Sequence, residues 1–175
     1  MLEIELKVRT DDLGGIRAKL REKGARFLHR LHEHDVYYNA PHRNFAETDE
    51  ALRIRYSEGK PVVTYKGAKL SGLGLKAREE LTTAVESGDV FEEILSRLGF
   101  VPAAAVNKWR ETYTLSPATI TLDEVEGLGT FVEIEVISEG DRSESLAIVS
   151  RIKKELGLTG EPILSSYLEL ILARA

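Results

Sequence analysis

The chain has 175 residues, of which 42% are hydrophobic and 30% charged, a composition typical of a folded domain rather than a disordered chain. Its net charge of -5 argues against a general affinity for nucleic acid, and the absence of cysteine excludes disulfides, thiolate metal sites and a cysteine nucleophile. No apolar run is long enough to span a bilayer, and the N-terminus has the pattern of a strand, not of a signal peptide. We therefore expect one cytoplasmic domain over residues 1–175, with neither membrane nor nucleic acid among its partners.

The first nine residues alternate without interruption between apolar and charged side chains, which predicts a β-strand. One face would carry Leu2, Ile4, Leu6 and Val8, and the other Glu3, Glu5, Lys7 and Arg9. Seven further strands are predicted at residues 32–39, 51–56, 62–66, 75–85, 106–115, 118–125 and 131–136. Most are joined by turns of hairpin length, so the sheet should be antiparallel.

Helical spacing of apolar residues predicts three amphipathic helices and a short fourth one. The first carries Leu13, Ile16 and Leu20 after a capping candidate at residues 10–12. The second starts with a capping box at residues 89–92, and its apolar face comprises Val90 or Phe91, Ile94, Leu95 and Leu98. The third covers residues 143–156, and Ser166 with Glu169 could cap a short final helix.

The charged faces of the strands admit two interpretations. In the first, each strand is half buried, with its apolar face in the core and its charged face in water. In the second, the sheet closes into a barrel that is lined by the charges, and helices cover its apolar outside. The amphipathic helices favour the second interpretation, because they must pack on an apolar face of the sheet.

The composition of the charged faces also favours closure. The basic members are Lys7, Arg9, Arg53, Arg55, Lys66, Lys76, Arg78, Lys108 and Arg110, and the acidic ones are Glu3, Glu5, Glu80, Asp123, Glu133 and Glu135. Two Glu-x-Glu pairs stand on the first and last strands, which closure would bring together. We predict an α+β fold: a closed eight-stranded antiparallel β-barrel with a charged lumen and amphipathic helices packed outside.

Such a lumen would need ionic partners, because buried charges are costly when unpaired. Clustered carboxylates suit Mg²⁺ or Mn²⁺ better than Zn²⁺, since cysteine is absent and the four histidines all lie within residues 29–42. Arginines and lysines at alternate strand positions match phosphate oxygens spaced along a chain. The pattern therefore points to a linear polyphosphate bound with one or two metal ions.

These residues resemble the signature of the CYTH, or triphosphate tunnel metalloenzyme, family. The resemblance begins at Glu3-x-Glu5-x-Lys7 and covers nearly the whole chain. It continues through residues 34–38, Leu52-Arg53-Ile54-Arg55, Thr64-Tyr65-Lys66-Gly67, Arg78-Glu79-Glu80, Lys108-Trp109-Arg110, residues 122–129 and Phe131-Val132-Glu133-Ile134-Glu135. The family implies an eight-stranded tunnel that binds a triphosphate with a divalent metal.

Carried over residue by residue, the resemblance implies a metal site and a triphosphate site. The metal ligands would be Glu3, Glu5, Glu133 and Glu135, with Glu80 and Asp123 contributing directly or through water. The triphosphate would be held by Lys7, Arg53, Arg55, Lys66, Lys76, Arg78, Lys108 and Arg110. We take Lys7, Lys66 and Glu135 as the catalytic candidates.

Three activities stay open at this point. Residues 35–53 most resemble class IV adenylate cyclases, which implies conversion of ATP to cyclic AMP and pyrophosphate. Hydrolysis of an inorganic or organic triphosphate would use the same residues, and a non-catalytic polyphosphate- or nucleotide-binding protein is the third alternative. Ala51 argues against thiamine triphosphate, for which the resemblance implies a tryptophan two residues before Arg53. The sequence leaves a homodimer open.

For a few conspicuous residues we expect structural instead of functional roles. His32 and His34 have metal-ligand spacing with Asp35, but histidine is often simply a polar residue of intermediate burial, and we expect solvated or hydrogen-bonded histidines. We expect Trp109 to pack beneath a helix, and Tyr167 either to close one mouth of the tunnel or to pack a helix. Residues 69–74 lack the lysine of a P-loop and are expected to form a mobile loop near the entrance.

Overall fold

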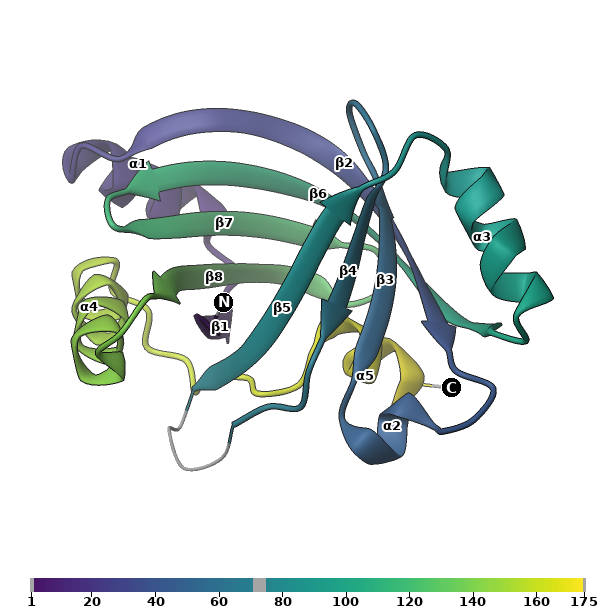
Figure 1. The fold of residues 1–175 in the computed structure, drawn as a ribbon. Helices are drawn as coiled ribbons and strands as arrows, with labels where there is room; N and C mark the ends of the chain where they lie inside the picture. Colours follow the sequence, from purple (N-terminus) through teal and green to yellow (C-terminus); the bar gives the residue numbers. More distant parts are fainter. Residues whose placement is uncertain (1, 71–74, 175) are drawn as a thin grey trace.

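The structure is a computed structural model that describes residues 2–70 and 75–174. Its eight antiparallel strands form a closed ring in the order β1-β5-β4-β3-β2-β6-β7-β8, in which β1 pairs with both β5 and β8 (Figure 1). The strands are β1 (Leu2–Arg9), β2 (Arg26–Asn39), β3 (Ala51–Tyr56), β4 (Val62–Lys66), β5 (Lys76–Ala84), β6 (Val101–Leu115), β7 (Ala118–Val125) and β8 (Gly129–Ser138). The predicted antiparallel pairing and the meeting of the first and last strands are thereby confirmed.

Two helices cover the outer face of the strands that close the ring. Helices α1 (Leu13–Glu22) and α4 (Arg142–Glu155) share one hydrophobic core with β1, β7 and β8. Ile4, Leu6 and Val8 of β1 are almost fully buried in that core. The apolar half of the N-terminal alternation therefore faces outward, under the helices, and its charged half faces into the ring.

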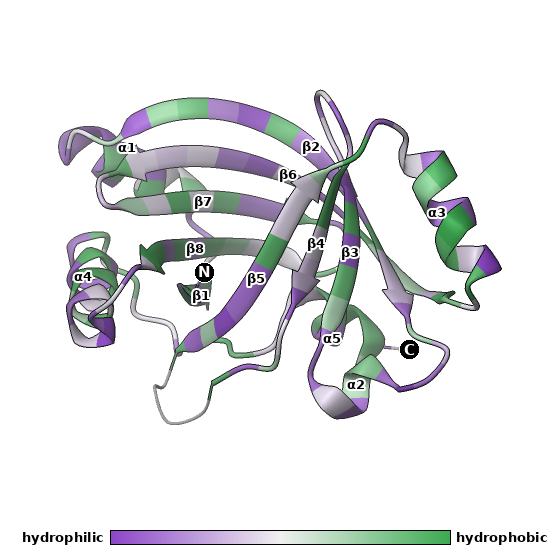
Figure 2. Ribbon diagram, viewed as in Figure 1, coloured by the Kyte–Doolittle hydropathy of each residue, from purple (hydrophilic) through white to green (hydrophobic). Residues whose placement is uncertain are grey.

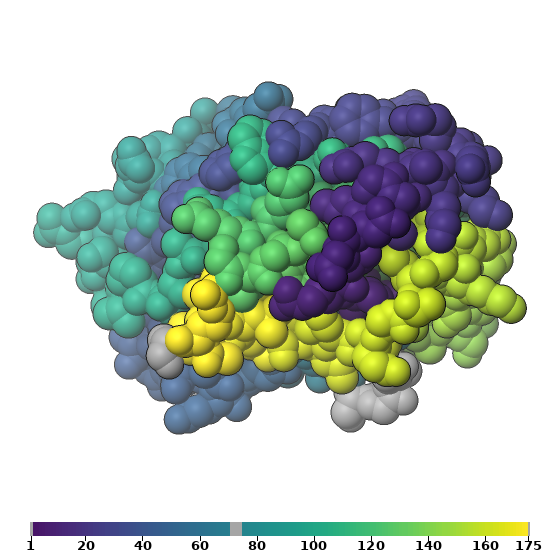
Figure 3. Space-filling model, turned by 180° about the vertical axis from the view of Figure 1, so that it is seen from behind, coloured from purple at the N-terminus to yellow at the C-terminus, as the bar shows by residue number. Residues whose placement is uncertain are grey.

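The remaining helices lie elsewhere around the ring. Helix α3 (Gly88–Arg97) packs Leu95 against the outer face of β2, β3 and β4, on the opposite side from α1 and α4. Helices α2 (Phe45–Thr48) and α5 (Tyr167–Leu172) lie close together at one end of the ring. Figure 3 shows the C-terminal segment beside the N-terminal strand, where Ile163 N–H donates to the carbonyl of Lys7 at 2.8 Å.

The hydropathy of the elements follows this arrangement. Apolar and polar residues alternate along the strands, because one face of each strand points into the ring and the other points outward (Figure 2). On α3 the apolar face is only partly used: Leu95 is buried, whereas Val90, Ile94 and Leu98 are exposed. Within the described residues, no helix combines the length and the apolar character needed to cross a membrane.

Several predicted local features differ from the structure. β2 begins at Arg26 instead of residue 32, because its whole length pairs with β6. Residues 40–50, between two of the predicted strands, contain α2, and α3 is capped by Ser87 instead of a capping box at residues 89–92. Most of the loop predicted at residues 69–74 lies outside the described residues.

The predicted burial of Trp109 beneath a helix is wrong. Its side chain is 43% exposed on the outer face of β6. Its ring lies 4.3 Å from the guanidinium of Arg30 and 5.2 Å from the ring of His32, both on β2. An aromatic ring stacked on neighbouring strands needs no helix to cover it.

Candidate active site

The inward-facing side chains surround a cavity of about 340 Å³. It is lined by side chains from seven of the eight strands and from α5, and seven of these side chains are cationic and five anionic. The cations are Lys7, Arg53, Arg55, Lys66, Lys76, Lys108 and Arg110, and the anions are Glu3, Glu5, Glu80, Glu133 and Glu135. The charged strand faces identified by alternation therefore meet around one space.

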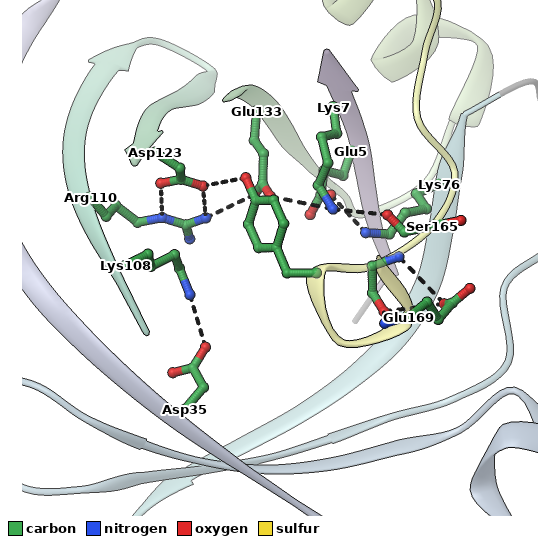
Figure 4. Close-up of polar contacts among 12 residues, drawn as sticks. Glu5, Lys7, Asp35, Lys76, Lys108, Arg110, Asp123, Glu133, Ser165 and Glu169 are labelled. Carbon is green, nitrogen blue, oxygen red and sulfur yellow. Dashed lines mark hydrogen bonds and ion pairs between the residues drawn. The ribbon is translucent and has the colours of Figure 1, made fainter. Parts of the chain in front are cut away.

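Strand register sets the order of the acidic residues along the cavity. Glu5 of β1 lies opposite Glu135 of β8, and Lys7 lies opposite Glu133. Lys76 Nζ donates to Glu5 at 3.0 Å, and Lys7 Nζ lies 3.7 Å from Glu133 (Figure 4). Both Glu-x-Glu pairs thus face the cavity from neighbouring strands.

A second group of carboxylates, buried in the wall and not lining the cavity, binds the basic residues. Asp35 accepts two hydrogen bonds from Arg55, at 2.7 and 2.8 Å, and a third from Lys108 at 2.9 Å. Asp123 binds Arg110 through both oxygens, at 2.7 and 2.5 Å (Figure 4). These bidentate pairs fix the planes of the two guanidinium groups, so Arg55 and Arg110 are preorganised at the cavity wall.

Arg53 differs from its neighbours. Its Nη2 donates to Thr64 Oγ1 at 3.3 Å, but its buried Nε has no hydrogen-bond partner among the described residues. A buried donor without an acceptor costs free energy that an incoming acceptor would recover. Arg53 therefore lines the cavity with a guanidinium that has no carboxylate partner among the described residues.

One end of the cavity has an excess of carboxylates. Burial, followed by the charge of Glu135 and a hydrogen bond with Glu80, raises the pKa of Glu3 to about 9. Burial and the charges of Glu5, Glu133 and Glu80 raise the pKa of Glu135 to about 7. Burial and mutual repulsion both favour the protonated forms of these carboxyl groups, and a bound cation would relieve the repulsion.

Desolvation also perturbs the lysines. Burial lowers the pKa of Lys7 and that of Lys108 to about 8 in each case. Burial and the neighbouring Arg53 lower the pKa of Lys66, although its Nζ pairs with Glu80 at 2.5 Å. Lys7, Lys66 and Lys108 are therefore partly desolvated cations whose charge a phosphate oxygen would stabilise.

The residues fit a hard divalent cation in kind. Glu3, Glu5, Glu80, Glu133 and Glu135 offer only oxygen ligands, as Mg²⁺ and Mn²⁺ prefer. Among the described residues, no three His, Asp or Glu side chains are already close enough together to hold one ion. Several of these carboxylates are instead engaged by lysines, so metal binding would require Lys76 or Lys66 to release its partner.

Some of the residues predicted for the site lie elsewhere. Arg78 donates to the carbonyls of Gly67 and Asp49, at 2.7 and 3.0 Å, and lines a separate pocket of about 180 Å³ between α2 and α5. Asp123 does not line the cavity, because both of its oxygens bind Arg110 and one also accepts from Tyr167. Arg78 thus fastens backbone segments together, and Asp123 positions Arg110.

Sequence reasoning missed part of the site. Glu33, Asp35 and Tyr37 alternate along β2, and Glu33 and Asp35 are buried against cations that line the cavity. Their period of two is the signal that could have placed them in the ring. Tyr167, which we expected either to close one mouth of the tunnel or to pack a helix, lines the cavity as the first residue of α5. His34 lies outside the cavity and is hydrogen-bonded to Asn107 at 2.7 Å, as expected for a hydrogen-bonded histidine.

Comparisons with known proteins agree with this arrangement. Residues 1–163 match the model of the CYTH domain family. A relative from Methanocaldococcus jannaschii, MJ0240, whose name provisionally assigns it as an adenylate cyclase, is 36% identical over 173 residues, which are 97% of this chain and 98% of the relative. The chain therefore belongs to the CYTH domain family.

Solved structures show the same fold. PH1819 from Pyrococcus horikoshii OT3 is 40% identical, with a TM-score of 0.89 over 99% of each chain. HpAC1 from Hippeastrum, a provisionally assigned adenylyl cyclase described as having a dominant triphosphatase activity, has a TM-score of 0.72. That protein is only 18% identical, over 99% of this chain and 95% of its own, so the likeness concerns the fold alone.

Proposed function

We propose that this protein is a metal-dependent enzyme that binds a triphosphate along the basic wall of its tunnel. The main observation is the cavity itself, where seven cations face five carboxylates, two of which, Glu3 and Glu135, have raised pKa values. A pure anion-binding protein would gain nothing from these carboxylates. Our first candidate reaction is the cyclisation of ATP to cyclic AMP and pyrophosphate, and the second is triphosphate hydrolysis.

The charge balance supports the metal requirement. Glu33, Asp35 and Asp123 already pair with cations that line the cavity. A triphosphate alone would therefore meet carboxylates as well as cations, and the like charges would repel. Mg²⁺ or Mn²⁺ on Glu3, Glu5, Glu80, Glu133 and Glu135 would remove this repulsion, polarise the phosphorus and lower the pKa of the attacking oxygen.

The other side chains of the cavity would bind the phosphates and transfer protons. Arg53, Arg55, Lys66, Lys108 and Arg110 would hold the phosphates and the charge that develops on the leaving group. Lys7, whose pKa is lowered to about 8 by burial, would act as a proton donor or acceptor near neutral pH, and Glu135 would act through the metal ion that it holds. Lys76 would complete the wall beside Glu5.

The names of two relatives support different reactions. MJ0240 carries an adenylate cyclase name, which favours attack by the ribose 3′-hydroxyl on the α-phosphorus. The triphosphatase activity stated for HpAC1 favours attack by water on the terminal phosphorus. The two reactions need the same clamp and differ only in which phosphorus faces the activated oxygen.

Product analysis separates these possibilities. The protein would be incubated with ATP or inorganic tripolyphosphate and with Mg²⁺, Mn²⁺ or a chelator, and the products followed by ³¹P NMR. Cyclic AMP with pyrophosphate would support cyclisation, and orthophosphate would support hydrolysis. Intact substrate under all conditions would contradict an enzyme. Glu135→Ala should abolish turnover with the fold intact, whereas the exposed Glu144→Ala serves as the matched control.

A further inference from the structure

Helix α3 carries an apolar stripe that no other part of the described chain covers. Val90, Ile94 and Leu98 are spaced by four residues, so they follow one another along one side of the helix and its C-cap. They are 59%, 49% and 64% exposed, whereas Leu95, which faces the sheet, is 6% exposed. Large apolar side chains that are contiguous on a surface indicate an interaction site, because their exposure to water costs free energy.

The body of the protein holds α3 in one orientation. Glu92 accepts hydrogen bonds from the hydroxyls of Tyr38, at 2.7 Å, and of Tyr56, and Leu95 packs in the core below the helix. Ser87 caps the N-terminus by accepting from Val90 N–H at 3.2 Å. The helix lies at the edge of the molecule, on the side away from α1 and α4 (Figure 1). The exposed stripe is therefore a preformed surface.

A charged stripe runs beside the apolar one. Asp89, Glu93 and Arg97 are also spaced by four residues, and each comes one position before a member of the apolar stripe. All three are exposed, and Arg97 Nε donates to Glu93 at 2.7 Å. One edge of the apolar surface thus carries two acids followed by a base. A partner of a single charge would be repelled by part of this edge, whereas a partner with the same order reversed would match all of it.

We infer that α3 is the interface of a dimer of this chain, in which two copies of the helix pack antiparallel about a two-fold axis at Ile94. Ile94 then contacts Ile94 of the second copy, and Val90 contacts Leu98 of the second copy. The two-fold axis places both charged stripes on the same side of the helix pair. With a rise of about 1.5 Å per residue, Arg97 lies about 3 Å along the axis from each of Asp89 and Glu93 of the second copy. Each arginine therefore stands between two carboxylates of the other chain.

The size of the surface sets the strength of the association. A stable interface buries about 800 Å² on each partner, and one face of a helix of 10 residues provides less than that. We therefore expect a dimer that dissociates in the micromolar range. No residue of α3 lines the cavity of the candidate active site, so the association leaves that cavity accessible.

Sedimentation equilibrium between about 5 and about 500 µM protein would test the inference. The mean mass should rise with concentration from that of the monomer toward twice that value. Leu98→Glu should weaken the association at least ~10-fold, because it buries a charge in the apolar contact. The control is Leu28→Glu, which makes the same substitution at a leucine that is 37% exposed near the start of β2 and should leave the association unchanged. A monomer at every concentration, or equal weakening by both variants, would overturn the inference.

Single cysteines would locate the two-fold axis, because the chain contains no cysteine of its own. Under mild oxidation, Ile94→Cys should form a disulfide-linked dimer at least ~10-fold faster than Ser96→Cys, which is exposed on the other side of the same helix. Val90→Cys and Leu98→Cys should cross-link faster when mixed than either does alone. Circular dichroism would confirm that the variants are folded. Equal rates at positions 94 and 96, or no preference for the mixed pair, would overturn the antiparallel interface.

Discussion

Lys108 and Asp35 form an ion pair of 2.9 Å in which each side chain is only 1% exposed. The two residues are 73 positions apart in the sequence and come from neighbouring strands, β6 and β2. Asp35 also holds Arg55 through both oxygens, so one carboxylate fixes two of the cations that face the cavity. The wall of the site and the stability of the ring therefore depend on the same group.

Loss of this carboxylate should destabilise the protein strongly. Asp35→Ala leaves Lys108 and Arg55 buried without their main partner, and breaking a buried ion pair from one side costs about 3–5 kcal/mol. Chemical denaturation would measure the free energy of unfolding. The exposed pair of Glu93 and Arg97 provides the control, because Glu93→Ala should cost only about 0.5 kcal/mol or less. Similar losses in both variants would contradict the structural role of Asp35.

Asp35 should also make stability depend on acidity. Burial on its own would raise the pKa of Asp35, but the hydrogen bonds from Arg55 and the charge of Lys108 outweigh burial and hold its pKa well below the usual range. The unfolded chain then takes up the proton first, near pH ~3.9, so the stabilisation is full above that pH and is lost as the pH falls toward the folded pKa. The free energy of unfolding, measured by denaturation from about pH 6 down to about pH 2.5, should fall more steeply with decreasing pH in the wild type than in Asp35→Asn. The same dependence of unfolding free energy on pH in both proteins would contradict a lowered pKa of Asp35.

Glu3 should have the opposite effect. Its pKa is raised to about 9, first by burial and then by Glu135, so the folded state keeps a proton that the unfolded state loses near pH ~4.3. Stability therefore falls as the pH rises from the unfolded value toward the folded one. At pH ~8 in a chelator, Glu3→Gln should be more stable than wild type by about 1–2 kcal/mol, a range reduced for partial solvation.

Adding Mg²⁺ tests whether repulsion between carboxylates causes the destabilisation at Glu3. Because a divalent cation would neutralise the carboxylates, Mg²⁺ should raise the melting temperature of the wild type more than that of Glu3→Gln. The measurement is differential scanning calorimetry with Mg²⁺ and with a chelator. A Glu3→Gln variant that is no more stable than wild type in the chelator would refute the proposed carboxylate repulsion.

Substitutions of Arg53 and Arg55 should have similar effects on triphosphate binding but different effects on the stability of the fold. Arg53→Met removes a guanidinium without a carboxylate partner among the described residues, so it should weaken triphosphate binding by about 1.5–3 kcal/mol with little change in unfolding. Arg55→Met should weaken binding similarly, but it also removes the bidentate partner of Asp35 and one of the two cations beside Glu33, and should therefore destabilise the fold. Calorimetric titration and chemical denaturation of the two variants check both effects. Unchanged affinity in Arg53→Met would rule out the assigned contact.

The sequence by itself determined which side of each strand carries the chemistry. In β1 the alternation of Ile4 and Leu6 with Glu3 and Glu5 is local, because neighbouring side chains of a strand always point to opposite faces. The same period of two predicted that Arg53 and Arg55 share one face of their strand, and that Glu133 and Glu135 share one face of theirs; all four line the cavity. Such patterns need no knowledge of the rest of the chain.

Only the tertiary structure decided which charges pair and which later segment reaches the cavity. Register between strands far apart in sequence put Asp35 on Arg55 and Asp123 on Arg110, and it turned Arg78 toward backbone carbonyls. Tyr167 reaches the cavity from a helix that follows all eight strands. Pairing across a ring depends on strand order and on the packing of later segments, and neither leaves a periodic trace in the sequence.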